Sequence, residues 1–288
     1  MNTPALAAAS LPKSDDTPVP PVPFEVDLWR HRRLLASFVR RDLRLRYAGS
    51  ALGAAWAIIH PLTVLALYIV VFSTLVRGGG FAVHGRVAGY ALFLCPALLA
   101  WNWTLESLIG ACGSVTGNGM LIKKLVFPSA ILPLAPVASG LLPFGASMAA
   151  FLIYAALTAG LSFKAMLWLP VLVVLQAALL AGLAYGLATL NVFLRDTQQM
   201  VTAGLQFVFW ATPIVYTPES LTGPYPWTAT WFQLNPRAWL VSAYRDVLVA
   251  GQAPDRVGLA DVAMVATVAY HVGRTMFLRG RKHFADEV

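Results

Sequence analysis

Charged side chains are scarce in this sequence. Only 12% of the 288 residues are Asp, Glu, Lys or Arg, whereas a soluble domain carries about 25%. Hydrophobic residues make up 58% of the chain, and the mean hydropathy is +0.67. These values exclude an ordinary soluble protein and predict an integral membrane protein with an all-α fold.

Cysteine is almost absent. The two that are present, Cys95 and Cys112, fall 17 positions apart in one apolar segment. In a helix this spacing separates them by about 25 Å, which is too far for a disulfide within one chain. We therefore expect two buried thiols that act as small apolar side chains.

The motifs of several chemistries are also missing. No G-x-x-x-x-G-K-[ST] motif is present, so we expect no ATP in a P-loop and no bound cofactor. The five histidines are scattered, which excludes the usual spacing of a metal site. The 13 carboxylates fall mostly in loops and form no catalytic cluster, so we expect a protein that is not an enzyme.

The first segments of the chain differ sharply in composition. Residues 1–26 are rich in proline and lack a basic region, which predicts a disordered tail and not a signal peptide. Residues 27–47 show apolar side chains at helical spacing, which predicts an amphipathic helix in the membrane interface. Its basic end has two open interpretations: anchoring by the positive-inside rule, or binding of a lipid headgroup by Arg40, Arg41, Arg44 and Arg46.

Six apolar segments predict six transmembrane helices. The third contains three prolines and exceeds a hydrocarbon core of about 30 Å, so we expect it to be kinked, tilted or broken. Between the fifth and sixth, the aromatic segment 216–258 predicts a pair of re-entrant helices. The predicted spans cover about 52–76, 88–110, 129–159, 167–192, 200–215 and 259–278.

The distribution of basic residues predicts the orientation. With both termini in the cytoplasm, fifteen of the 21 Lys and Arg residues lie inside and six lie outside, in agreement with the positive-inside rule. The six are Arg77, Arg86, Lys164, Arg237, Arg245 and Arg256. Because the basic residues flank apolar spans, the net charge of +8 indicates contact with membrane lipids and no nucleic acid.

Two features lie inside the predicted spans. Glu106 falls in the second span near Asn102 and Trp103, and an ionisable group at that depth indicates function unless a partner group neutralises it. Gly182 and Gly186 form a G-x-x-x-G motif on the fourth span, which predicts close contact with another helix.

Several local motifs together resemble the ABC-2 permeases that export bacterial surface polysaccharides such as O-antigen, teichoic acid and capsule. Each motif is weakly specific alone, but their order and spacing extend over most of the chain. They are R-D-L-R-L-R-Y at 41–47, S-A-L-G-A-A-W at 50–56, W-N-W-T-L-E-S at 101–107, N-G-M-L-I-K-K-L-V-F-P at 118–128, L-N-V-F-L-R-D at 190–196 and F-W-A-T-P-I-V-Y at 209–216.

This resemblance implies a homodimer in the bacterial inner membrane, bound to two separate ATP-binding cassette subunits that hold ATP and Mg. It also implies that the inner loop after the second span docks on the ATPase, together with the inner turn after the fourth span. The expected coupling residues are Asn118, Lys123, Lys124, Phe127, Pro128, Arg195 and Asp196.

The expected function is export of a lipid-linked polysaccharide. Sugars present C–H faces that stack on aromatic rings, so the expected substrate path includes Trp101, Trp103, Glu106, Tyr216 and Trp231. The alternatives are export of a drug or small lipid, a membrane enzyme acting on lipid-linked sugars, and an ion-coupled transporter. The last two would need clustered carboxylates or paired intramembrane charges, which the sequence lacks.

Overall fold

The computed structural model describes residues 28–46, 48–75, 81–83, 86–124 and 128–288. The tail predicted over 1–26 and the predicted coupling residue Phe127 lie outside the described residues.

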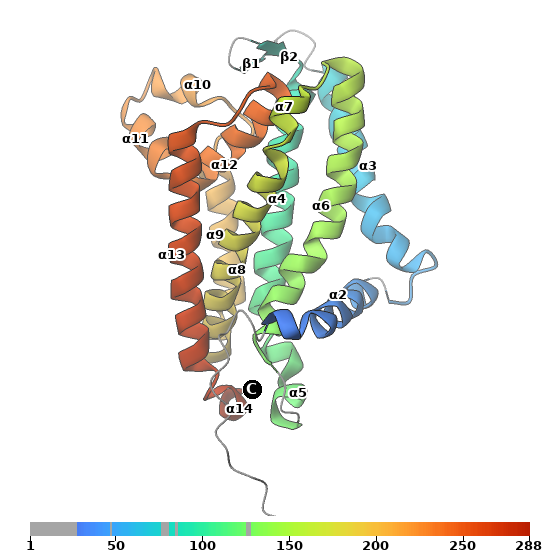
Figure 1. The fold of residues 1–288 in the computed structure, drawn as a ribbon, viewed down its shortest axis with the longest axis vertical. Helices are drawn as coiled ribbons and strands as arrows, with labels where there is room; N and C mark the ends of the chain where they lie inside the picture. Colours follow the sequence, from blue (N-terminus) through green and yellow to red (C-terminus); the bar gives the residue numbers. More distant parts are fainter. Residues whose placement is uncertain (1–27, 47, 76–80, 84–85, 125–127) are drawn as a thin grey trace, which may run out of the picture.

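Long helices running side by side form the body of the protein (Figure 1). Each one overlaps a segment that the sequence analysis predicts as a span. They are α3 (Trp56–Leu75), α4 (Tyr90–Cys112), α6 (Ile131–Thr158), α8 (Leu169–Phe193), α9 (Thr197–Ala211) and α13 (Arg256–Gly280).

Within the described residues, three helical stretches are long and apolar enough to cross a membrane: Tyr90–Cys112, Ile131–Thr158 and Phe163–Phe193, the last of which includes the short α7 (Phe163–Met166). In α3 the apolar stretch Trp56–Phe72 is shorter. Helix α9 has 15 residues and is therefore about 22 Å long, less than the hydrocarbon thickness. The helices indicate a multi-pass membrane protein.

The third predicted span is one continuous helix. Helix α6 has 28 residues and passes through Pro136 and Pro143 without a break. At about 1.5 Å per residue it is roughly 42 Å long, so it must tilt or extend beyond the hydrocarbon core.

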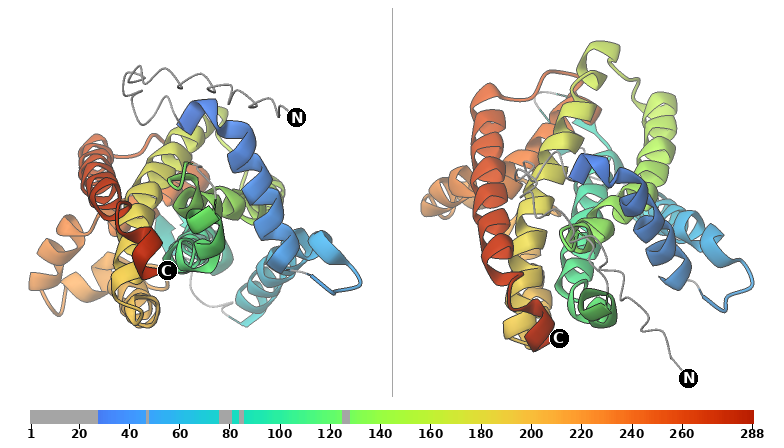
Figure 2. Two further views of the ribbon diagram at one scale, coloured as in Figure 1. Left: turned by 90° about the horizontal axis from the view of Figure 1, so that it is seen from below. Right: turned by 60° about the horizontal axis from the view of Figure 1, so that its bottom comes forward.

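The short elements gather at the two ends of the bundle. At one end, called the α5 end here, lie α2 (Arg32–Arg46), α5 (Gly119–Lys124) and α14 (Phe284–Glu287) (Figure 1). Helix α2 crosses the direction of the long helices and contacts α6 on the outside of the bundle (Figure 2). Apolar positions along one face of α2 explain this placement, because an amphipathic helix must cover its apolar stripe.

The opposite end, called the α10 end here, carries the segment that was predicted as re-entrant (Figure 1). It contains α10 (Pro218–Thr222), α11 (Trp227–Leu234) and α12 (Pro236–Arg245), followed by the π-helical turn Asp246–Ala250. The Asn235 side chain accepts a 2.9 Å hydrogen bond from the Arg237 amide, which caps α12. Helix α12 is packed into the bundle, with Leu240, Val241 and Tyr244 buried.

A small hairpin at the α10 end was not predicted. Strands β1 (Phe81–Val83) and β2 (Arg86–Ala88) pair in antiparallel register, with Phe81 opposite Ala88. The polar, glycine-rich composition of the surrounding segment favours a turn, but three-residue strands are too short to show an alternating pattern.

Helix α4 forms the centre of the core. Its first half, as far as Trp101, is apolar all round, and every residue from Ala91 to Trp101 is buried. Its neighbours include α3, α6, α8, α9 and α12. Both cysteines, Cys95 and Cys112, lie on α4 and are free and buried, as expected.

The close helix contact predicted at the G-x-x-x-G motif is confirmed. Gly182 of α8 lies directly against Gly273 and the Ala269 backbone of α13. A methyl group added at Gly182 would overlap the α13 backbone, and one added at Gly273 would overlap the Gly182 carbonyl. Glycine is therefore required on both helices for this approach.

Candidate functional site

A polar cluster joins α2 to the bundle. Asp42 and Arg46 lie one turn apart on the same face of α2, and Arg46 Nε is 3.1 Å from Asp42 Oδ2. Arg46 Nη1 also forms a 3.0 Å ion pair with Glu106 Oε2 on α4. The Ser139 hydroxyl on α6 donates a 2.6 Å hydrogen bond to Asp42. These four side chains hold α2 against two of the long helices, α4 and α6.

The four arginines predicted to bind lipid headgroups divide into two pairs. Arg41 donates a hydrogen bond to Asn118 Oδ1, and Arg46 is engaged in the cluster with Asp42 and Glu106. All four are exposed, but among the described residues the side chains of Arg40 and Arg44 form no hydrogen bond or ion pair. Of the four, the second pair is therefore better placed to meet lipid phosphates.

The predicted coupling residues around α5 lie at one end of the bundle. Asn118 precedes α5 and donates a 2.8 Å hydrogen bond to the Ser114 carbonyl, while its oxygen accepts from Arg41. Lys123 is exposed, and Lys124 is the last residue of α5. The Pro128 carbonyl accepts a 3.1 Å hydrogen bond from the Ile131 amide at the start of α6.

The carboxyl terminus borders the same region. An open hollow of about 500 Å³ is lined by residues 116–121, Arg41, Lys123 and Val288. The Val288 side chain lies so close to Gly119 that a methyl group there would overlap it. Helix α14 also contacts α5, and Phe284 is buried against Phe277. Sequence analysis did not place this end of the chain beside the predicted coupling loop.

Arg195 and Asp196 form the exposed turn between α8 and α9. The turn is fixed by Asn191, whose side chain accepts a 3.2 Å hydrogen bond from the Gln198 amide. Gln198 lies beside Gly113, next to the end of α4. The second predicted coupling pair is thus at the same end of the bundle as α5 (Figure 1).

The two tryptophans of the predicted substrate path are buried. Trp103 is 2% exposed, donates a 3.0 Å hydrogen bond to the Val137 carbonyl and stacks on Phe144. Trp101 is 6% exposed and lies between Phe209 of α9 and the guanidinium of Arg237. Both rings therefore pack between helices within this chain.

A cavity of about 220 Å³ lies between α3, α4 and α6. Glu106 and Trp103 line it on α4, and His60 and Tyr68 line it on α3. The Glu106 carboxylate thus faces this cavity while it is paired with Arg46. The partner group expected for Glu106 is therefore Arg46 of α2.

The other two predicted path residues secure the end of α9. The Tyr216 hydroxyl donates a 2.8 Å hydrogen bond to the Trp210 carbonyl, and Trp231 Nε1 donates a 3.1 Å bond to the Ala211 carbonyl. Trp231 remains 47% exposed, and the Tyr216 ring lies 6.2 Å from Phe232. Both residues belong to the α10 end, far along the chain from the tryptophans of α4.

Sequence reasoning missed a buried polar network around Arg237. Arg237 on α12 donates to the Thr104 hydroxyl of α4, which also accepts from Gln176 of α8 at 3.3 Å. Gln176 in turn accepts a 2.9 Å hydrogen bond from the Tyr244 hydroxyl. The network connects α4, α8 and α12 inside the bundle.

Arg245 on the last turn of α12 has a different role. It is 4% exposed and donates to the carbonyls of Phe93, Pro213 and Ile214 at 3.0, 2.8 and 2.6 Å. Its guanidinium also stacks 3.6 Å from the Phe93 ring centre. Both arginines were predicted as outer-loop charges. An arginine inside an apolar segment was the available signal for a buried role.

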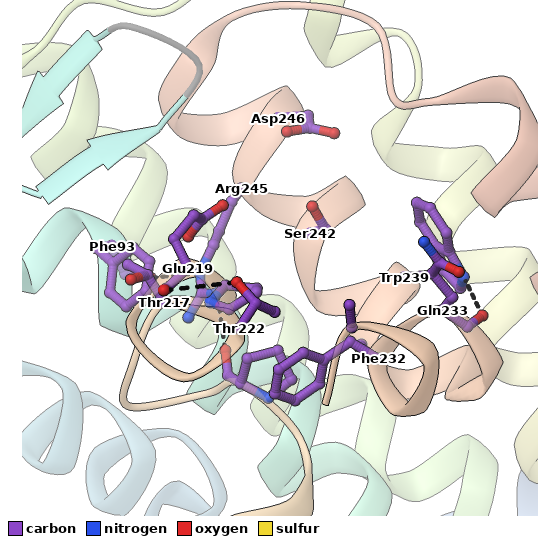
Figure 3. A pocket seen from close by; sticks show the side chains of 14 residues that line it. Phe93, Thr217, Glu219, Thr222, Phe232, Gln233, Trp239, Ser242, Arg245 and Asp246 are labelled. Atoms are coloured by element: carbon purple, nitrogen blue, oxygen red, sulfur yellow. Dashed lines mark hydrogen bonds between the residues drawn. The ribbon is translucent and has the colours of Figure 1, made fainter. Parts of the chain in front are cut away.

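A pocket of about 320 Å³ opens at the α10 end (Figure 3). Trp239 and Gln233 lie on one side, and Glu219, Thr217 and Arg245 lie on the other, as Figure 3 shows. Its remaining lining includes Phe93, Thr222, Phe232, Ser242 and Asp246. The described part of the chain contains no group of three or more His, Cys, Asp or Glu side chains that could hold a metal ion.

Comparison with known proteins agrees with this architecture. The chain is 28% identical over 262 residues to the O-antigen export system permease protein RfbA of Myxococcus xanthus, covering 91% of this chain and 98% of the relative. It is 30% identical over 222 residues to a protein of the same name from Klebsiella pneumoniae, covering 76% of this chain and 81% of the relative. The family model described as "ABC-2 type transporter" matches residues 33–249. The chain therefore belongs to the ABC-2 type transporter family.

Proposed function

We propose that this protein is the permease subunit of an ATP-driven exporter that moves a lipid-linked, O-antigen-like polysaccharide across the bacterial inner membrane. The observation that carries the proposal is the similarity to O-antigen export permeases over 91% of the chain. The protein is then a transport subunit, and ATP with Mg is bound and hydrolysed by a separate partner.

The α5 end is proposed to face the cytoplasm and to dock two ATP-binding cassette subunits on a permease homodimer. Its exposed groups include Lys123, Arg195 and Asp196, which can pair with charged groups of a partner. Arg237 and Arg245, which this orientation places toward the outside, form hydrogen bonds within the protein. They are therefore not free positive charges of an outer loop and do not contradict the orientation. The inner surface then keeps its large excess of basic residues, as the positive-inside rule requires.

Movement of α5 is proposed to reach the membrane helices through α2. Arg41 connects Asn118 to α2, and Arg46 connects α2 to Glu106 at the wall of the 220 Å³ cavity. A displacement of the coupling loop would therefore shift the interfacial helix and the carboxylate that faces the cavity. Exposed Arg40 and Arg44 are proposed to bind the diphosphate of the lipid carrier.

The substrate path is proposed to pass Trp101, Trp103, Glu106, Tyr216 and Trp231 after helices separate at the dimer interface. In the described conformation the two α4 tryptophans are closed off by Phe209 and Phe144. This packing supports a resting state in which the path through the chain is shut.

The test combines inactivation of the gene with coupling variants. Loss of the protein should abolish surface polysaccharide, and the wild-type protein should co-purify with an ATPase whose hydrolysis rises when substrate is present. The Lys123→Gln variant should keep its fold and its ATPase partner but export several-fold less polysaccharide. The matched control is Lys282→Gln, an exposed lysine near the same end.

Two outcomes would contradict the proposal. Normal surface polysaccharide after gene inactivation, with altered resistance to a drug, would favour export of a small molecule. Purification of the protein without any ATPase, together with transport that does not depend on ATP, would exclude an ABC exporter.

A further inference from the structure

We propose that the pocket at the α10 end is a binding site for an uncharged pyranose unit of the exported glycan. The inference rests on the proposed function, because it takes the exported molecule to be a polysaccharide. It adds a defined site, formed by α10, α11 and α12, and a preference for neutral over acidic sugars.

The dimensions of the pocket suit a sugar. Its volume of about 320 Å³ falls at the lower end of the range for small-molecule sites, about 300–1,000 Å³. The pocket opens to the outside, so one unit of a longer chain can enter while its neighbours remain in solvent. A cavity of this kind differs from the closed packing around Trp101 and Trp103.

The lining combines the two kinds of group that recognise sugars. Trp239 and Phe232 provide apolar surface for C–H groups, whereas the Phe93 ring is 2% exposed and stacked against Arg245. Thr217, Thr222, Gln233 and Ser242 provide hydroxyl and amide groups that exchange hydrogen bonds with sugar hydroxyls. These groups come from both sides of the pocket, so a ring between them can be contacted on opposite edges (Figure 3).

The charges of the lining select against an acidic sugar. Glu219 and Asp246 contribute two carboxylates, while Arg245 is the cation in the lining. Arg245 uses Nε, Nη1 and Nη2 to bind three backbone carbonyls, and its planar face stacks on Phe93. It therefore braces the wall, and its charge offsets one of the two carboxylates, so the lining keeps a net negative charge. Carboxylates accept hydrogen bonds from sugar hydroxyls but repel a uronate or a phosphate.

The walls are fixed before a ligand arrives. Trp239 Nε1 donates a 2.8 Å hydrogen bond to the Gln233 carbonyl, and the Trp239 ring lies directly against Gly258 of α13. Arg245 ties α12 to Pro213 and Ile214, on the chain that leads into α10. A site held in this way loses little conformational entropy on binding, which favours affinity for a small ligand.

The position of the pocket connects it with the predicted path. The ring of Phe232, on the pocket wall, has its centre 6.2 Å from that of the Tyr216 ring. The Tyr216 hydroxyl in turn donates a hydrogen bond to the Trp210 carbonyl at the end of α9. With the α5 end in the cytoplasm, the pocket lies on the outer side. It would hold a sugar that has already crossed and so oppose its return.

The binding test uses the full-length protein in nanodiscs and three probes: methyl glucoside, methyl N-acetylglucosaminide and methyl glucuronide. Calorimetry should give saturable binding of at least one neutral glycoside with Kd of about 1–10 mM, and binding of the glucuronide at least about tenfold weaker. The Glu219→Gln variant should weaken binding of the neutral glycoside about tenfold, since it removes a charged acceptor. Glu219 is exposed, so this substitution preserves the fold.

Two controls keep the test specific. Glu287→Gln removes an exposed carboxylate at the α5 end, and Trp227→Ala removes a 69% exposed ring of α11 that does not line the pocket. Both should bind like the wild type. In cells, Glu219→Gln should slow the appearance of surface polysaccharide several-fold without reducing the amount of permease in the membrane.

The inference is overturned if no neutral glycoside binds up to about 100 mM, if the glucuronide binds best, or if Glu219→Gln leaves both binding and export unchanged. Such a failure is separate from failure of the proposed function. If only the sugar site is wrong, inactivation of the gene still abolishes surface polysaccharide. If the proposed function is wrong, inactivation leaves surface polysaccharide in place.

Discussion

Arg46 of α2 lies 3.0 Å from Glu106 of α4, 60 positions further along the chain. This ion pair joins the helix predicted to lie in the membrane interface to a carboxylate predicted to lie within a span. It places a guanidinium beside the Glu106 carboxylate at the edge of an apolar bundle. It also gives one side chain in the cavity wall a direct connection to α2.

Breaking this pair should loosen α2. We expect Arg46→Gln and Glu106→Gln each to lower the free energy of unfolding, and a double-mutant cycle to give a coupling of about 0.5–1 kcal/mol, since the two side chains are 28% and 41% exposed. Thermal unfolding in detergent and proteolysis of α2 would measure the effect. Additive losses in the double variant would mean that the two charges do not interact.

Neutralising the exposed arginines should separate anchoring from headgroup binding. The Arg40→Gln, Arg44→Gln double variant should insert and unfold like the wild type, because neither side chain belongs to the Asp42 and Arg46 cluster. Its binding to vesicles with anionic lipids should fall by about 1 kcal/mol per arginine, and export should fall with it. Unchanged binding and export would remove both residues from the proposed headgroup site.

The hydrogen bond between Arg41 and Asn118 should matter for coupling. Asn118→Ala removes the acceptor of Arg41 and the donor to the Ser114 carbonyl, so residues 116–118 lose two side-chain contacts, including the one to α2. We expect more ATP hydrolysed per polysaccharide exported, by several-fold, in reconstituted vesicles. Gln199→Ala, an exposed amide on α9, is the matched control and should leave the ratio unchanged.

The contact between α8 and α13 should tolerate no side chain. Gly273→Leu would drive a side chain into the Gly182 carbonyl, and we expect a loss of about 3 kcal/mol or a protein that does not assemble. Gly204→Ala on α9 is the control, because a methyl group there meets open space. It should change stability by at most about 1 kcal/mol. Size-exclusion profiles and thermal unfolding would distinguish the two variants.

Removal of the Tyr244 hydroxyl from the buried network should lower the stability of the protein measurably. Tyr244→Phe leaves the Gln176 oxygen without its 2.9 Å hydrogen bond inside the bundle, which should lower the free energy of unfolding by about 1–3 kcal/mol. Tyr225→Phe removes the same atom from a side chain that is 55% exposed, and we expect it to have almost no effect. Equal effects in the two variants would show that the network contributes little.

Hydropathy and periodicity predicted the long helices because both properties are local. The segments predicted as spans overlap α3, α4, α6, α8, α9 and α13, with boundaries that differ by a few residues. Crossing the membrane at all six positions remains a prediction, since α9 has 15 residues and α13 is less apolar than α4, α6 and α8. The β1–β2 hairpin is too short to produce a recognisable pattern.

The site was harder to predict because its contacts are distant in sequence. Glu106 was singled out from its depth, but nothing local indicates Arg46 as its partner. Arg237 and Arg245 were assigned to the outside from charge counting, while their true partners lie on α4 and on the chain before α10. Only the tertiary fold turns these arginines into internal groups.

The backbone contact between Gly182 and Gly273 has a mechanical consequence. Helices separated by a layer of side chains can slide when those side chains change rotamer, but α8 and α13 have no such layer at this point. They should therefore move as a single lever that extends from α14 to the Trp239 wall, which rests on Gly258 of α13. A tilt of this lever at the α14 end would therefore shift the Trp239 wall of the pocket at the α10 end.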